Sequence, residues 1–350
     1  MRRFQPARRA LKRGALVAAA NWPIIIIQAS ADLLAKLLML VTAVAGVVLV
    51  VLLVGAEPSA MMRLRADLPS TIFALLIARP IAFVSFVAAM AVAVLGGSVF
   101  IFLVKGGTVA LLVRAEREAA AVEEPPLQPS QIATAAAFTI ERFIEGSRAL
   151  FPRFTRLGGL LMLIYALSAV ALIAVTFGDG PDGLLIPAAA SVLFVIWITA
   201  VNLLYLLAQI VMAAEGCGVG AACRRALGFV RRVSRTVLGV CVVTVGLVLL
   251  ATAASFVAAT ALGLVSFVPI VGLAVWPLQL VALALRALVL QYISLSSVGA
   301  YSALYRGHSS ESAEPADSAR PAESAERAHH LANRLDAGSP GVRASRAEAG

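Results

Sequence analysis

Five arginines fall within twelve positions of the chain, in a stretch that lies between two long apolar runs. On a helical wheel at about 100° per residue they share an arc of about 120°, and small and apolar side chains occupy the opposite side. Guanidinium groups gathered in this way can hold phosphate groups of nucleic acid, of a nucleotide or of anionic lipid. The arginines are Arg224, Arg225, Arg231, Arg232 and Arg235.

The glycine-rich segment beside them, GCGVG at 216–220, does not favour a nucleotide. No strand is predicted before it and no Gly-Lys-Ser/Thr sequence follows, which excludes the common phosphate-binding loops. We therefore predict an amphipathic helix at the membrane surface. Its apolar side would enter the interface while the arginines contact anionic headgroups, at about 1 kcal/mol each, and no nucleic-acid partner is expected.

A second set of polar residues lies inside the apolar runs and forms a candidate intramembrane polar site. Asn202, Tyr205 and Gln209 share one side of a predicted span, where they either hydrogen-bond to other helices or line a substrate path. Arg286 is the single charge between Thr236 and Tyr305.

Two alternatives stay open for Arg286. If its span begins at Leu278, Arg286 lies about 12 Å from the outer end of the helix and attracts an anion. If the span begins near Ala287, Arg286 instead reaches the outer interface. Asp32 and Lys36 lie four residues apart on one helical face, and they are expected to pair near the interface.

Residue types that carry catalysis or bind metal are scarce. The three histidines, His308, His329 and His330, all lie near the carboxyl terminus, and no paired acids or His–Asp pair is placed for catalysis. Cys217 and Cys223 are separated by five residues with no histidine nearby, which is not a zinc-binding pattern. We expect no catalytic residue, no metal, no cofactor and no disulfide framework.

The elements that must position these residues are membrane spans. Hydrophobic residues make up 61% of the chain and charged residues 14%, with a mean hydropathy of +0.93, whereas soluble domains are about 25% charged. Such a chain predicts an all-α polytopic membrane protein with about six transmembrane helices and several cytoplasmic amphipathic surface helices. The spans are predicted near 33–54, 81–104, 157–177, 188–213, 237–262 and 278–300.

The 29 lysines and arginines orient these spans. Positive charge gathers on the cytoplasmic side of a membrane, and an even number of spans returns both termini to one side. We therefore predict a multi-pass protein of the bacterial cytoplasmic (inner) membrane with both termini in the cytoplasm. Counts by segment are six in 1–31, seven in 105–156, five in 214–236 and six in 301–350, against three in 55–80.

Three domains are predicted: a basic cytoplasmic segment at 1–31, the six-span membrane domain at 32–306 and a disordered cytoplasmic tail at 307–350. Further surface helices are predicted at 138–154, directly before the third span, and less clearly at 7–17. A short interfacial helix is expected on the outer face within 56–80. A linker is expected at 122–131.

The segment IVMAAEGCGVGAACRRALGFVRRV, together with the later SVGAYSALYR, resembles a family of uncharacterised bacterial six-helix integral membrane proteins. This family is similar to the membrane domain fused to some glycerophosphodiester phosphodiesterases. The resemblance covers roughly residues 10–306 and rests on pattern, since no invariant motif supports it. The catalytic domain's histidine and glutamate ligands are missing here, so the resemblance implies no enzymatic residue.

These observations favour a non-enzymatic inner-membrane protein, a scaffold or accessory protein that organises lipid or a partner at the cytoplasmic face. Its expected partners are the anionic headgroups of membrane lipids, together with a protein partner or a second copy of the chain. The alternative is a small permease or lipid transporter with a polar site inside the helix bundle, because many transporters are built from internal repeats.

Overall fold

The computed structural model describes residues 5–54, 80–119, 129–177, 185–265 and 269–337. Throughout these residues the regular elements are helices, with no strand, which confirms the predicted all-α class. The chain divides into two units, Met1–Ala303 and Leu304–Gly350, which are described separately. The helices are α1 (Gln5–Ala20), α2 (Trp22–Val54), α5 (Pro80–Glu118), α6 (Pro129–Ala135), α7 (Ile140–Phe177), α8 (Leu185–Glu215), α9 (Val219–Arg232), α10 (Ser234–Val265) and α11 (Pro269–Ala337).

Six helices in the described residues are long and apolar enough to cross a membrane, which confirms the predicted number and a multi-pass membrane protein. Each of these helices runs past the predicted span at one end or both, and in α5 the residues after Val104 continue the same helix to Glu118. The candidate spans are Trp22–Gly46, Val84–Glu118, Ile140–Thr176, Ala188–Glu215, Ser234–Leu264 and Val275–Ser309.

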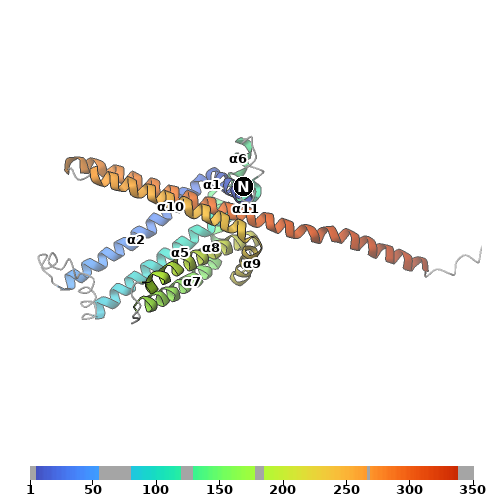
Figure 1. The fold of residues 1–350 in the computed structure, drawn as a ribbon, viewed down its shortest axis with the longest axis horizontal. Coiled ribbons are helices and arrows are strands. Elements are labelled where there is room, and N and C mark those ends of the chain that lie inside the picture. The colour runs from blue at the N-terminus through green and yellow to red at the C-terminus, as the bar shows by residue number, and fades with distance from the viewer. Residues whose placement is uncertain (1–4, 55–79, 120–128, 178–184, 266–268, 338–350) are drawn as a thin grey trace, which may run out of the picture. The chain divides into compact units, whose positions relative to one another are not determined.

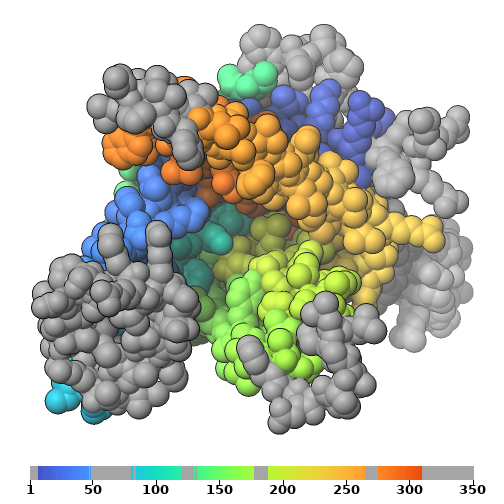
Figure 2. Space-filling view, turned by 60° about the vertical axis from the view of Figure 1, so that its left-hand side comes forward, coloured from blue at the N-terminus to red at the C-terminus, as the bar shows by residue number. Residues whose placement is uncertain are grey.

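The flanks of these helices are apolar and largely uncovered by protein. Leu249, Leu250 and Phe256 of α10 are 64%, 68% and 73% exposed. Figure 2 shows a hollow between these helices, with α2 in blue, α10 in yellow and orange, and α7 and α8 in light green around it. Apolar surface of this extent cannot face water, so lipid is the expected solvent of the helix flanks.

The core of the first unit is built around α5, which packs against α2, α7 and α8 (Figure 1). Small residues let the backbones of α5 and α7 approach closely. A Cβ atom added at Gly107 would lie 2.7 Å from the carbonyl oxygen of Phe143. Contacts between small residues are a common way for membrane helices to associate, because lipid tails compete with larger apolar side chains.

Within the predicted N-terminal segment at 1–31 lies the helix α1, which is packed into the first unit. It contacts α5, α6 and α10, and Val17 and Ala18 are buried. Near its middle α1 crosses α11, where a Cβ atom on Gly299 would lie 2.9 Å from the Cα atom of Gly14. Only small residues permit this crossing, and α2 then begins at Trp22, well before the predicted start of the first span.

Two further boundaries differ from the prediction. The surface helix predicted at 138–154 and the third span form one continuous helix, α7, although Pro152 lies inside it. The tail predicted to be disordered from residue 307 is helical as far as Ala337, since α11 continues into the second unit. A lack of large apolar residues limits what a segment can bury, but Ala, Glu and Arg are all strong helix formers.

Several predicted connections lie outside the described residues. The interfacial helix expected within 56–80 falls there except for Pro80, which begins α5, and the linker expected at 122–131 falls there as far as residue 128.

Candidate functional site

The arginine-rich helix α9 lies against the bundle through its small and aromatic side chains. Ala222, Ala226 and Phe229 are buried, and α9 packs mainly on α8, with further contacts to α7 and α10. The arginines predicted for this surface are all exposed. Protein contacts therefore hold α9 in place and turn its arginines outward. Leu227 lies on the uncovered side of this helix and is 41% exposed, whereas Phe229 is 2% exposed.

The last of the five arginines lies on a different helix. α9 ends at Arg232, and Val233 interrupts the helical geometry with φ −116° and ψ 28°, while its N–H still bonds to the carbonyl oxygen of Phe229 at 3.0 Å. Arg235 therefore falls in the first turn of α10. A helical wheel assumes one unbroken axis, so it could not separate Arg235 from the other four. We call Arg224, Arg225, Arg231 and Arg232 the α9 arginines.

The carboxyl end of α8 is held by cations from two other helices. Arg117 of α5 donates to the carbonyl oxygen of Ala214, and Arg225 of α9 pairs with Glu215. The helix stops at Gly216, which adopts a left-handed φ of 64° and donates its N–H to the carbonyl oxygen of Met212 at 2.9 Å. Cations are favourable at a helix carboxyl terminus because the last carbonyl groups carry partial negative charge.

The predicted polar stripe lines a cavity of about 410 Å³ between α5, α7 and α8, which we call the α5/α7/α8 cavity. Asn202, Tyr205 and Gln209 all face it. The hydroxyl of Tyr165, from α7, donates to Asn202 Oδ1 at 2.5 Å. Gln209 is 2% exposed, and its amide nitrogen has no hydrogen-bond partner among the described residues.

The same cavity contains Lys105, which the sequence analysis assigned to the charge count of a cytoplasmic segment. Its Nζ lies 5.8 Å from the centre of the Tyr205 ring, within the range of a cation–π contact. Asp32 of α2 attracts it electrostatically without lining the cavity. A sequence signal for this placement exists, because the apolar run GGTVALLV follows Lys105 and extends the helix well beyond it.

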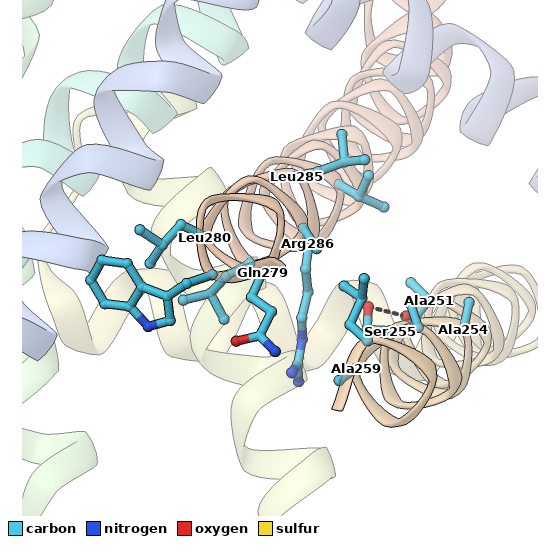
Figure 3. A pocket seen from close by; sticks show the side chains of 14 residues that line it. Ala251, Ala254, Ser255, Ala259, Gln279, Leu280, Leu285 and Arg286 are labelled. Carbon is cyan, nitrogen blue, oxygen red and sulfur yellow. Dashed lines mark hydrogen bonds between the residues drawn. The ribbon is translucent and has the colours of Figure 1, made fainter. Parts of the chain in front are cut away.

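Arg286, the fourth residue of the predicted polar site, lines a different cavity. This cavity of about 660 Å³ lies between α10 and α11 and is walled mainly by alanine and leucine. Figure 3 shows Arg286 and Gln279 extending from α11 to the same side, toward Ala259 of α10. The structure thus splits the predicted site into two.

The position of α11 also bears on the two alternatives for Arg286. The helix begins at Pro269, so Arg286 lies about 25 Å along it at about 1.5 Å per residue. Both alternatives concern where the membrane span begins, and a helix can begin before its span, so the two alternatives stay open. The side chain itself is exposed. The predicted pair of Asp32 and Lys36 is confirmed, with Lys36 Nζ 2.6 Å from Asp32 Oδ2.

A buried ion pair that the sequence analysis missed fixes α1 to α5. Arg13 Nε lies 3.0 Å from Glu116 Oε1, and their side chains are 7% and 1% exposed. Arg13 also donates to the carbonyl oxygens of Glu116 and Ala119, at 3.2 and 2.8 Å. Directly after α1, the fully buried Asn21 donates to the carbonyl oxygen of Ala135 in α6 at 2.8 Å.

Together these groups can attract anions at the surface and inside the bundle. The part of the chain that the structure describes contains no group of three or more His, Cys, Asp and Glu residues suited to a metal ion. Comparison of the chain with protein-family models, curated proteins and solved structures gives no match. The described residues have the fold of an all-α membrane protein and contain six candidate spans.

Proposed function

We propose that the protein is a non-enzymatic scaffold or accessory protein of the bacterial inner membrane, which gathers anionic lipid at its cytoplasmic face. The observation that carries this proposal is the outward-facing α9 arginines on a helix that is fixed to the bundle by Ala222, Ala226 and Phe229. A rigid row of guanidinium groups suits phosphate headgroups, since each guanidinium offers several donors in a fixed plane.

The charge distribution supports the orientation. Positive residues gather where α1, α9 and the neighbouring ends of α5 and α7 lie, and the positive-inside rule assigns that side to the cytoplasm. The proposal differs from the sequence prediction in one respect. The buried side of α9 contacts protein, so lipid binding depends on the arginines more than on insertion of an apolar face.

The size of the effect follows from the number of arginines available. Each basic side chain near an anionic surface contributes about 1 kcal/mol. Arg225 is already paired with Glu215, which leaves Arg224, Arg231 and Arg232. About 3 kcal/mol corresponds to a change in lipid affinity of roughly 150-fold.

The test is mass spectrometry of the protein extracted in native lipid discs. The wild type is compared with Arg224/Arg225/Arg231/Arg232→Gln and with a charge-conserving variant that carries lysine at the same four positions. We expect anionic lipid, or an acidic protein partner, to be lost from the glutamine variant and retained in large part by the lysine variant. Equal anionic lipid content and identical partners in all three would reject the proposal.

The second candidate function is a small permease or lipid transporter, and the α5/α7/α8 cavity favours it. A transporter should lose flux when Asn202 or Arg286 is replaced, because each lines a cavity in the membrane-spanning helices. A scaffold should tolerate these changes and fail when the α9 arginines are removed. Uptake and lipid-transfer assays on Asn202→Leu and Arg286→Gln, beside the glutamine variant above, separate the two functions.

A further inference from the structure

We propose that the α5/α7/α8 cavity is a binding site for an anionic group, a carboxylate or a phosphate, with Lys105 as its charged contact. The inference does not depend on the proposed scaffold function, because the α9 arginines take no part in this cavity. It rests on the charge of the lining, the hydrogen-bonding groups left available, and the apolar wall that surrounds them.

The charge of the lining is positive. Lys105 is the one charged side chain among the residues that line the cavity, and it lies over the face of Tyr205. The nearby carboxylate of Asp32 is bound to Lys36 at 2.6 Å and belongs to a helix that does not line the cavity. A cation in a membrane-spanning helix is costly unless it is paired, which makes such residues markers of ion or substrate sites.

Two of the hydrogen-bonding groups that line the cavity are amide nitrogens, which can only donate. The oxygen of the Asn202 side chain accepts from the hydroxyl of Tyr165, and the amide nitrogen of Asn202 is a donor. The amide nitrogen of Gln209 is buried and has no partner in the described residues. A buried donor without an acceptor is unfavourable, and an anion beside Lys105 would supply the missing acceptor.

The wall of the cavity is apolar. Ile101, Phe102, Leu161, Met162 and Leu206 surround the polar groups. A volume of about 410 Å³ falls within the range of about 300–1,000 Å³ found for small-molecule sites. A charged head with an apolar body fits this lining best, and the same head chemistry also occurs in small soluble anions.

The binding test uses the purified full-length chain in discs of zwitterionic lipid, with radiolabelled palmitate, acetate and inorganic phosphate as probes. We expect saturable binding of palmitate or phosphate, and Lys105→Gln should weaken it by at least tenfold. Gln209→Leu should weaken it by about threefold to tenfold. Palmitate binding at least tenfold tighter than acetate identifies an amphiphile as the ligand. If acetate or phosphate binds as tightly as palmitate, the ligand is a small soluble anion.

Two controls keep loss of folding separate from loss of the site. Lys105→Arg preserves the charge and should retain binding, and Arg286→Gln, which alters a cation outside this cavity, should leave it unchanged. Hexadecanol matches palmitate in length but lacks the charge, so it should compete poorly even in the wild type. Wild-type affinity in Lys105→Gln, effective competition by hexadecanol, or no saturable binding of any anion would overturn the proposal.

Discussion

Replacing Arg13 by methionine should destabilise the protein more than any change on the exposed side of α1. Arg13 contributes one ion pair to Glu116 and two hydrogen bonds to the carbonyl oxygens of Glu116 and Ala119. When Arg13 is removed, the Glu116 carboxylate, which is 1% exposed, loses this cation. Two carbonyl groups at the end of α5 also lose a charged donor. Breaking a buried pair from one side costs about 3–5 kcal/mol.

Replacing the partner residue, Glu116, by glutamine should destabilise the protein less. Glu116→Gln keeps a side-chain oxygen that can accept from Arg13, and it keeps both backbone acceptors, so the expected loss is about 1–3 kcal/mol. The free energy of unfolding is measured by titrating sodium dodecyl sulfate into detergent micelles that contain the protein. Arg9→Gln is the matched control on the same helix, since Arg9 is exposed, and it should change stability by less than about 0.5 kcal/mol.

A double substitution completes the cycle. If Arg13→Met and Glu116→Gln act through the same contact, their combined effect should fall short of the sum of the two by more than about 0.5 kcal/mol. The reasoning is refuted if Arg13→Met is no more destabilising than Arg9→Gln. It is also refuted if the Arg13 and Glu116 effects are strictly additive, because the pair would then not hold α1 to α5.

Two further predictions concern packing and thiol chemistry. Gly14→Ala should destabilise the chain by about 1–3 kcal/mol in the same unfolding assay, because the added methyl meets the α11 backbone at Ser296 and Ala300. Gly96→Ala is the control. A Cβ atom there meets no neighbouring side chain or helix within 4 Å, so this change should be neutral or stabilising. Burial raises the pKa of the Cys223 thiol, so its labelling by a membrane-impermeant maleimide should still rise with pH above the ordinary value of 9.0. With Cys217 and Cys241 replaced by serine, this labelling should occur in inverted inner-membrane vesicles and not from the periplasmic side. A rate that levels off below pH 9.0, or labelling from the periplasm, would contradict the burial or the orientation.

The sequence predicts the fold well where a signal is local. An uncharged apolar run long enough to cross a bilayer is such a signal, and all six predicted spans correspond to helices in the structure. Helix ends are less predictable, because polar residues next to an apolar run do not stop a helix. The continuous helix through Pro152 and the helical part of the tail both reflect this.

The candidate sites were predictable only within single helices. Asn202, Tyr205 and Gln209 share a face of α8, so a helical wheel groups them correctly. Lys105 and Tyr165 reach the same cavity from α5 and α7, and no pattern within α8 contains that information. Arg286 was grouped with the stripe because both are polar groups in apolar runs, although α11 carries it to a separate cavity.

The helix α5 connects these observations physically. At its carboxyl end Glu116 is held to α1 through Arg13, and Arg117 is held to α8 through the carbonyl oxygen of Ala214. About two and a half turns earlier in the helix, Gly107 permits the close backbone contact with α7. A shift of α5 by one turn, about 5.4 Å, would break all three contacts at once. The register that they impose places Lys105 opposite Tyr205, so the charged contact of the cavity is positioned by residues that never touch its ligand.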